Sequence, residues 1–101
     1  MILNILERLT LLSILPKEGD YVTLKILRDL RMALGLTEEE LKNWNVVQEE
    51  TRVTWDENGE AEIPIGEKAM GIIVDRLRDM DEKKQLTDQS VAVYEKFIPT
   101  T

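Results

Sequence analysis

The sequence predicts a single α+β domain, mostly helical, with about five helices and one β-hairpin at about residues 51–65. Apolar residues recur every three or four positions along most of the chain, which is the period of a helix packed on one face. Between residues 51 and 65 they alternate with polar residues, as in a half-buried strand. The length of 101 residues suits one domain with a small core. We therefore expect the order helix, helix, helix, hairpin, helix, helix over residues 1–101.

The first helix is expected over residues 4–15. Asn4 is a good N-cap, and Glu7, three residues later, completes a capping-box pattern. Residues 16–19 (Pro-Lys-Glu-Gly) end the helix, because proline and glycine interrupt helical hydrogen bonding. The expected apolar stripe is Ile5, Leu9 and Leu12, widened by Leu6, Leu11 and Leu15.

The second and third helices both begin at strong capping residues. The second is expected from Asp20, its N-cap, to about Leu34, with Gly35 following as a helix-ending residue. The third is short, from Thr37 to about Trp44, and three glutamates follow Thr37 where the helix dipole favours negative charge. In the second helix the expected buried positions are Val22, Ile26, Leu30 and Ala33, with Leu24, Leu27 and Leu34 beside them.

The hairpin is expected on either side of residues 56–59, whose sequence Asp-Glu-Asn-Gly suits a tight turn. Its first strand carries Val53 and Trp55 between polar neighbours. In its second strand Pro64 cannot donate to a ladder, which places that strand at an edge. The alternating apolar residues of the second strand are Ala61, Ile63 and Ile65.

Two helices close the chain. One is expected over residues 66–84, with Arg76 on its polar side, and the other from Thr87, its N-cap, to about Phe97. A lone hairpin is marginal in water, so we expect it to pack against helices. The expected buried residues are Ala69, Ile73, Leu77 and Met80 in the former helix, and Val91, Tyr94 and Ile98 in the latter.

Negative charge is concentrated in one quarter of the chain. The sequence has 20 acidic and 13 basic residues, a net charge of −7. Residues 38–62 hold nine of the acids and two of the bases, so they carry the whole excess of seven. Such a stretch favours a partner with a basic surface. The candidate partner-binding residues are Glu38, Glu39, Glu40, Trp44, Glu49, Glu50, Asp56, Glu57, Glu60 and Glu62.

Composition argues against several chemistries. The chain has no histidine and no cysteine, which excludes a Ser-His-Asp triad, thiolate chemistry and disulfides and disfavours a zinc site. Residues 56–60 look like part of a calcium loop but lack the EF-hand spacing. We expect no catalytic residue, no metal, no cofactor and no signal peptide or membrane segment, and a cytoplasmic location.

Three functions are compatible with this pattern. The first is a non-enzymatic protein-interaction module, which includes an acidic mimic of nucleic acid. Trp44 would be either a core anchor or an interface anchor. Self-association is a further expectation, because the long apolar helices can leave a stripe uncovered. The second is a DNA-binding winged helix, from the order helix, helix, hairpin, although its third helix and wing would be acidic where phosphate binding needs Lys and Arg. The third is an enzyme that uses paired carboxylates.

Several short segments resemble small uncharacterised proteins of about 100 residues that are encoded in phage and prophage genomes. The resemblance covers most of the chain, but its motifs are structural and none is catalytic. It implies an accessory protein in the bacterial cytoplasm or in the virion, acting in virion assembly or in countering host defence. The segments are residues 7–12 (Glu-Arg-Leu-Thr-Leu-Leu), 14–16 (Ile-Leu-Pro), 18–20 (Glu-Gly-Asp), 66–69 (Gly-Glu-Lys-Ala) and 94–97 (Tyr-Glu-Lys-Phe).

Overall fold

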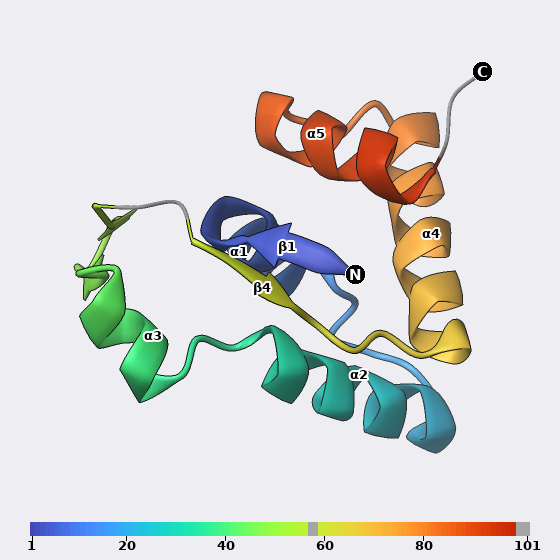
Figure 1. Ribbon diagram of the computed structural model, residues 1–101. Helices are drawn as coiled ribbons and strands as arrows, with labels where there is room; N and C mark the ends of the chain where they lie inside the picture. Colours follow the sequence, from blue (N-terminus) through green and yellow to red (C-terminus); the bar gives the residue numbers. More distant parts are fainter. Residues whose placement is uncertain (57–58, 99–101) are drawn as a thin grey trace.

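The computed structural model describes residues 1–56 and 59–98, and these form an α+β fold dominated by helices (Figure 1). The predicted fold class is therefore confirmed. In chain order the elements are β1 (Ile2–Asn4), α1 (Ile5–Ile14), α2 (Tyr21–Leu34), α3 (Glu38–Asn43), β2 (Val47–Gln48), β3 (Val53–Thr54), β4 (Glu60–Glu62), α4 (Glu67–Glu82) and α5 (Asp88–Phe97).

The predicted helix starts are confirmed by their capping hydrogen bonds. The side chain of Asn4 accepts from the amide of Glu7 at 2.8 Å, and the Glu7 carboxylate accepts from the Asn4 amide at 2.9 Å. Thr37 and Glu40 form a second capping box at α3. At α2 the Asp20 carboxylate accepts from an amide in the first turn, and this hydrogen bond lowers the pKa of Asp20. These caps satisfy amides that have no partner within their own helix.

The strands pair differently from the expected hairpin. The segments on either side of residues 56–59 do not pair with each other: β3 pairs with β2, with Val47 opposite Thr54, and β4 pairs with β1. The hairpin is therefore β2–β3. Residues 57–58 of the expected turn lie outside the described residues. Alternation with period two identifies the faces of a strand but not its partner. Strand β1 was not predicted: it precedes the first helix and shares with it only the capping residue Asn4.

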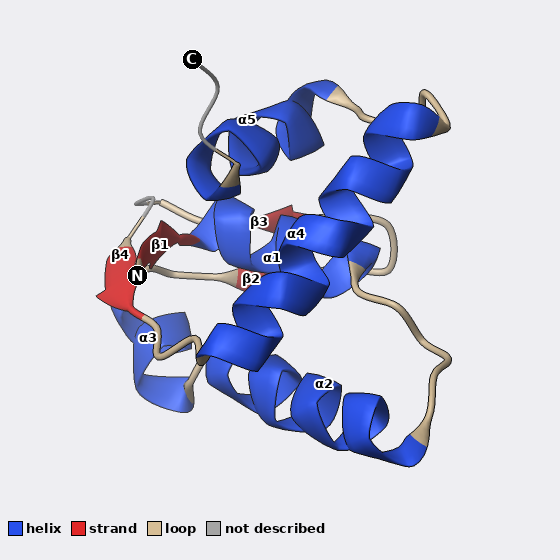
Figure 2. Cartoon of the chain, turned by 90° about the vertical axis from the view of Figure 1, so that its right-hand side faces the viewer, coloured by secondary structure: helices blue, strands red, loops and turns tan. Residues whose placement is uncertain are grey.

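The core lies where α1 packs against α2 and α5, with α4 packed against α2 and α5 (Figure 2). Helix α4 buries the four positions that its period predicts, and Ile73 and Leu77 are completely buried. Strand β1 adds Leu3, which is also completely buried. None of the helices formed by residues 1–56 and 59–98 is long and apolar enough to cross a bilayer.

The expected face of α2 is rotated in the structure. Leu27, Leu30 and Leu34 are buried, whereas Val22 is 60% exposed. Two neighbouring lines of apolar residues share this helix, and each fits the spacing of three and four. Contact with α1 and α4 selects the line through Leu27, which sequence spacing alone cannot do. The opposite face of α2 consequently exposes apolar residues to solvent.

The expected face of α5 is also rotated. Val93 and Phe97 are buried, whereas Val91 is exposed and Tyr94 is half-buried. Ile98 is buried as expected. In α1 the buried side includes Arg8 and Thr10 as well as apolar residues. The positions of the apolar residues alone therefore do not predict which side of this helix is buried.

Candidate functional site

The acidic stretch forms a separate lobe of the molecule. Residues 37–56, which we call the acidic lobe, comprise α3, β2 and β3 and lie beyond the carboxyl end of α2 (Figure 1). They contain six acids and two bases, a difference of four. Of the predicted site residues, the acidic lobe exposes Glu38, Glu39, Glu49, Glu50 and Asp56.

The acidic lobe has no buried core of its own. Among the described residues between Leu34 and Ile63, none is buried. The lobe nevertheless contains a group of apolar side chains that are only half-buried, together with Val47, which is 50% exposed. The half-buried side chains are Leu41, Trp44, Val46, Val53 and Trp55.

Trp44 lies between the two roles expected for it. It is half-buried, and its indole packs against Gly59, so closely that a Cβ atom at position 59 would overlap the ring. The Trp44 carbonyl accepts a hydrogen bond from the Asp56 amide at 3.0 Å. The Asp56 carboxylate accepts from the Asn45 side-chain amide at 2.7 Å. Trp44 therefore anchors the lobe internally while part of its surface stays accessible.

Substituting Gly59 tests this packing. Gly59→Ala should destabilise the protein by about 1–3 kcal/mol, the usual cost of overpacking, because the indole of Trp44 has to move. The measurement is urea unfolding together with the tryptophan emission of the native state. Gly71→Ala is the control for adding a Cβ where it meets nothing within 4 Å; at this exposed helical position alanine should stabilise by up to about 1 kcal/mol. A Gly59→Ala variant with the stability and the emission spectrum of the wild type would contradict the contact.

A buried arginine fixes the base of the acidic lobe. Arg8 of α1 is only 1% exposed, and its guanidinium bridges α2 and α3. Its Nε donates to the Leu34 carbonyl at 2.9 Å and its Nη2 to the Gly35 carbonyl at 2.6 Å. Its Nη1 and Nη2 donate to the two carboxylate oxygens of Glu40, at 2.8 and 3.2 Å. One side chain thus ties the end of α2 to the first turn of α3, in the bidentate geometry that arginine favours with carboxylates.

Glu40 consequently differs from the other predicted site residues. One of its oxygens also accepts from the Thr37 amide at 2.9 Å, in the capping box. The hydrogen bond from Arg8 holds the pKa of Glu40 below its ordinary value. The carboxylate of Glu40 is therefore committed to internal contacts instead of to a partner. Sequence reasoning missed Arg8, although its position three residues from both Ile5 and Leu11 places it on the buried side of α1.

The remaining predicted residues divide between the lobe and the body. Glu49 pairs with Arg52 across the β2–β3 turn at 2.9 Å, and both side chains are largely exposed. Glu60 and Glu62 belong to β4, beside β1, and Glu62 pairs with the terminal ammonium of Met1 at 2.8 Å. Glu57 lies outside the described residues. The structure thus separates β4 from the acids of α3 and the β2–β3 hairpin.

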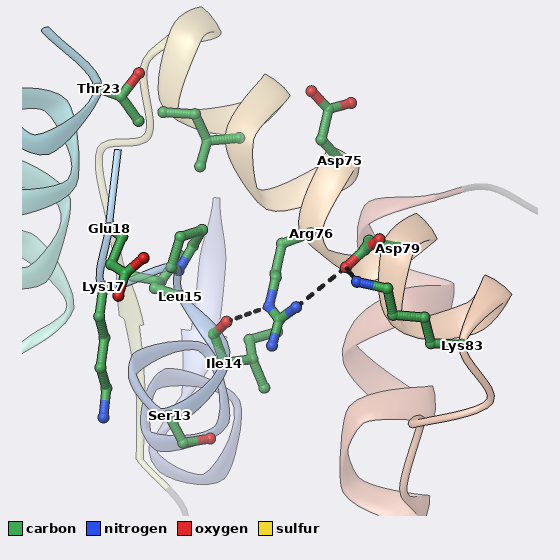
Figure 3. Close-up of a pocket in the computed structure, with 12 residues that line it drawn as sticks. Ser13, Ile14, Leu15, Lys17, Glu18, Thr23, Asp75, Arg76, Asp79 and Lys83 are labelled. Atoms are coloured by element: carbon green, nitrogen blue, oxygen red, sulfur yellow. Dashed lines mark hydrogen bonds and ion pairs between the residues drawn. The ribbon is translucent and has the colours of Figure 1, made fainter. Parts of the chain in front are cut away.

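A groove of about 1040 Å³ lies between α4 and the end of α1 with its following loop (Figure 3). Arg76 occupies its floor: its Nε donates to the Ile14 carbonyl at 2.7 Å, and its Nη1 lies 3.3 Å from Asp79. Lys83 pairs with the same carboxylate at 3.1 Å, and the hydroxyl of Ser13 donates to the Thr10 carbonyl. The hydrogen bond from Arg76 to Ile14 joins α4 to α1, whereas the pairs with Asp79 are local to α4. Arg76 is therefore a structural residue and not the freely replaceable surface residue that its place on the helix predicts.

Within residues 1–56 and 59–98, no three acidic, histidine or cysteine side chains are grouped so that they could hold a metal ion.

Comparison with known proteins identifies no family for this chain. No protein family, curated protein or solved structure matches the chain.

Proposed function

We propose that the protein is a non-enzymatic interaction module whose acidic lobe docks on a basic surface of a partner protein. The observation that carries the proposal is the combination of excess negative charge with the absence of buried residues in the lobe. A lobe that leaves Trp44, Trp55 and Val47 partly in water gains burial when a partner covers it. Tryptophan is also enriched among the residues that dominate interface energetics.

The charges of the lobe would act mainly on the rate of association. Exposed acids steer a basic partner into encounter, and salt screens this attraction over about 10 Å at 0.1 M. The half-buried apolar side chains would then set the lifetime of the complex, because burial opposes dissociation. A phage-encoded accessory role, in virion assembly or in inhibition of a host protein in the bacterial cytoplasm, rests on the resemblance of the short segments described above.

DNA binding in the manner of a winged helix has less support. Helix α3, which would enter the major groove, exposes Glu38 and Glu39. The β2–β3 turn that would serve as the wing carries Glu49 and Glu50 beside Arg52. Both elements would approach phosphates with negative charge, whereas affinity for DNA comes from neutralising phosphates with Lys and Arg.

Neutralising the lobe tests the proposed function. Glu49→Gln with Glu50→Gln should leave the melting temperature almost unchanged, since both residues are exposed, and should reduce capture of a basic protein from bacterial lysate. Bound protein should be released from the wild type by salt. The control, Glu82→Gln with Glu95→Gln, removes two exposed acids outside the lobe and should capture as the wild type does. If both variants retain the same proteins as the wild type, the lobe is only a solvated surface.

A further inference from the structure

Helix α2 presents a second surface that the proposed function does not use. Its outward side carries apolar and basic residues together, opposite the buried Leu27, Leu30 and Leu34. Tyr21 and Met32 are 77% and 76% exposed, although both are large and partly apolar. We call this surface the basic face; it consists of Tyr21, Leu24, Lys25, Arg28, Arg31 and Met32.

The residues of the basic face lie side by side because of their spacing. Tyr21, Lys25, Arg28 and Met32 follow one another at four, three and four positions, which places them along one line of the helix. A shallow hollow of about 300 Å³ lies along the first three of these residues and is also lined by Leu24 and Arg31, so its lining contains three cations and no acid. Asp29 instead lines a groove toward Pro64 and Gly66, on another side of the helix.

We propose that the basic face binds the acidic lobe of a second copy of this chain. This inference rests on the proposed function and names the partner of the same lobe. The two surfaces are complementary in charge, since exposed Lys25 and Arg28 would meet exposed Glu49 and Glu50. Both surfaces also expose apolar area that contact would bury. Tyr21 and Met32 are exposed on the basic face, and the lobe has half-buried tryptophans and a partly exposed valine.

Within one molecule the acidic lobe leaves the basic face uncovered. Arg8 holds the first turn of α3 against the carboxyl end of α2, so the lobe lies beyond that end (Figure 1). The basic face runs from Tyr21, at the amino end of the same helix, to Met32, near its carboxyl end, and is directed away from the residues that α2 buries. Arg31 is held in this arrangement by a hydrogen bond to the Pro16 carbonyl at 2.6 Å. Tyr21, Lys25, Arg28 and Met32 all stay exposed in this arrangement, so the basic face is open to a second chain.

Such a contact is head-to-tail. Each chain contributes its lobe to one neighbour and its basic face to another, so association continues until a ring closes or an open chain forms. This differs from a two-fold dimer, in which the same patch is used by both partners. Assembly by this route should be weakened by salt, because opposite charges that remain near solvent are screened.

Sedimentation velocity of the full chain tests the proposal. At about 0.05 M salt the mean mass should rise above the 11.7 kDa of one chain as the concentration approaches about 1 mM, and at about 0.5 M salt it should fall back. Lys25→Gln with Arg28→Gln should weaken association at least about fivefold, and so should Glu49→Gln with Glu50→Gln. All four residues are exposed, so thermal melts should show that both variants remain folded.

Mixing the two variants distinguishes a head-to-tail contact from any other. The Lys25/Arg28 variant keeps an intact lobe, and the Glu49/Glu50 variant keeps an intact basic face. Together they should form a pair with one chain of each, which cannot grow further, at concentrations where each variant alone associates much less than the wild type. A mixture that behaves as the sum of its two components would overturn the proposal.

The remaining outcomes separate this inference from the proposed function. A wild type that stays monomeric at low salt, or a Lys25/Arg28 variant that associates as the wild type does, overturns the second copy as partner. If the Glu49/Glu50 variant nevertheless loses capture of a different basic protein, the lobe belongs to that protein and the proposed function stands. If the Glu49/Glu50 variant self-associates and captures proteins as the wild type does, both proposals are rejected.

Discussion

Arg8→Met is expected to destabilise the protein by about 3–5 kcal/mol, the range for removing one partner of a buried ion pair. Methionine approximates the length of the aliphatic part of the side chain, so the loss arises chiefly from the guanidinium. Four hydrogen bonds disappear, and the carbonyls of Leu34 and Gly35 and the carboxylate of Glu40 lose their partner. Urea unfolding at neutral pH measures the change.

Two further variants show which property of Arg8 is responsible. Arg8→Lys keeps the positive charge but cannot form the bidentate fork, so its stability should fall between those of the wild type and Arg8→Met. Arg78→Met makes the same chemical change at an exposed position of α4 and should alter stability by less than about 0.5 kcal/mol. If Arg8→Met proved as mild as Arg78→Met, Arg8 would not anchor the lobe.

The pair also predicts how stability depends on pH. Arg8 lowers the pKa of Glu40 in the folded state below its ordinary value of 4.5, so the unfolded chain binds a proton more readily than the native protein does. The stabilisation is fully present above the unfolded pKa and is lost as pH falls through the folded pKa. Between pH of about 6 and about 3, Arg8→Met should therefore lose less stability than the wild type. Identical pH slopes for the two proteins would contradict this linkage.

Much of the fold follows from local features of the sequence. Helix starts at Asn4, Asp20 and Thr37 were predictable because each is a local feature. The capping side chain accepts a hydrogen bond from an amide only three positions later. The buried line of α4 was predictable because a single apolar stripe dominates it. In α2 two lines compete, and the choice between them depends on contact with α1 and α4, which the spacing within α2 does not specify.

The strand pairing was not predictable for a related reason. Leu3 and Ala61 are separated by most of the acidic stretch, and their pairing depends on where α1 and α4 place the two ends. The candidate site was partly predictable, because charge is read directly from composition. The commitment of Glu40 to Arg8 was not, since 32 positions separate these residues and nothing local links them.

Ile73→Ala is expected to cost about 2–5 kcal/mol, the range for truncating a fully buried isoleucine. Ile73 lies at the centre of the buried line of α4, is completely inaccessible to solvent, and belongs to the main apolar core. Removing its outer methyl groups leaves a cavity that packed helices fill only in part, so the loss exceeds the transfer free energy of those groups. Urea unfolding of wild type and variant gives the difference, provided that the slope with urea is unchanged.

The appropriate control for this substitution is Arg78→Ala. Arg76 lies on the polar side of α4 by spacing, but its hydrogen bond to the Ile14 carbonyl makes Arg76→Ala a second destabilising change. Arg78 is exposed on the same helix and should change stability by less than about 0.5 kcal/mol when truncated. We therefore expect the loss of stability to be largest for Ile73→Ala, smaller for Arg76→Ala and smallest for Arg78→Ala. Equal losses at Ile73 and Arg78 would show that α4 faces the core with a different side, and would contradict the packing on which the whole arrangement depends.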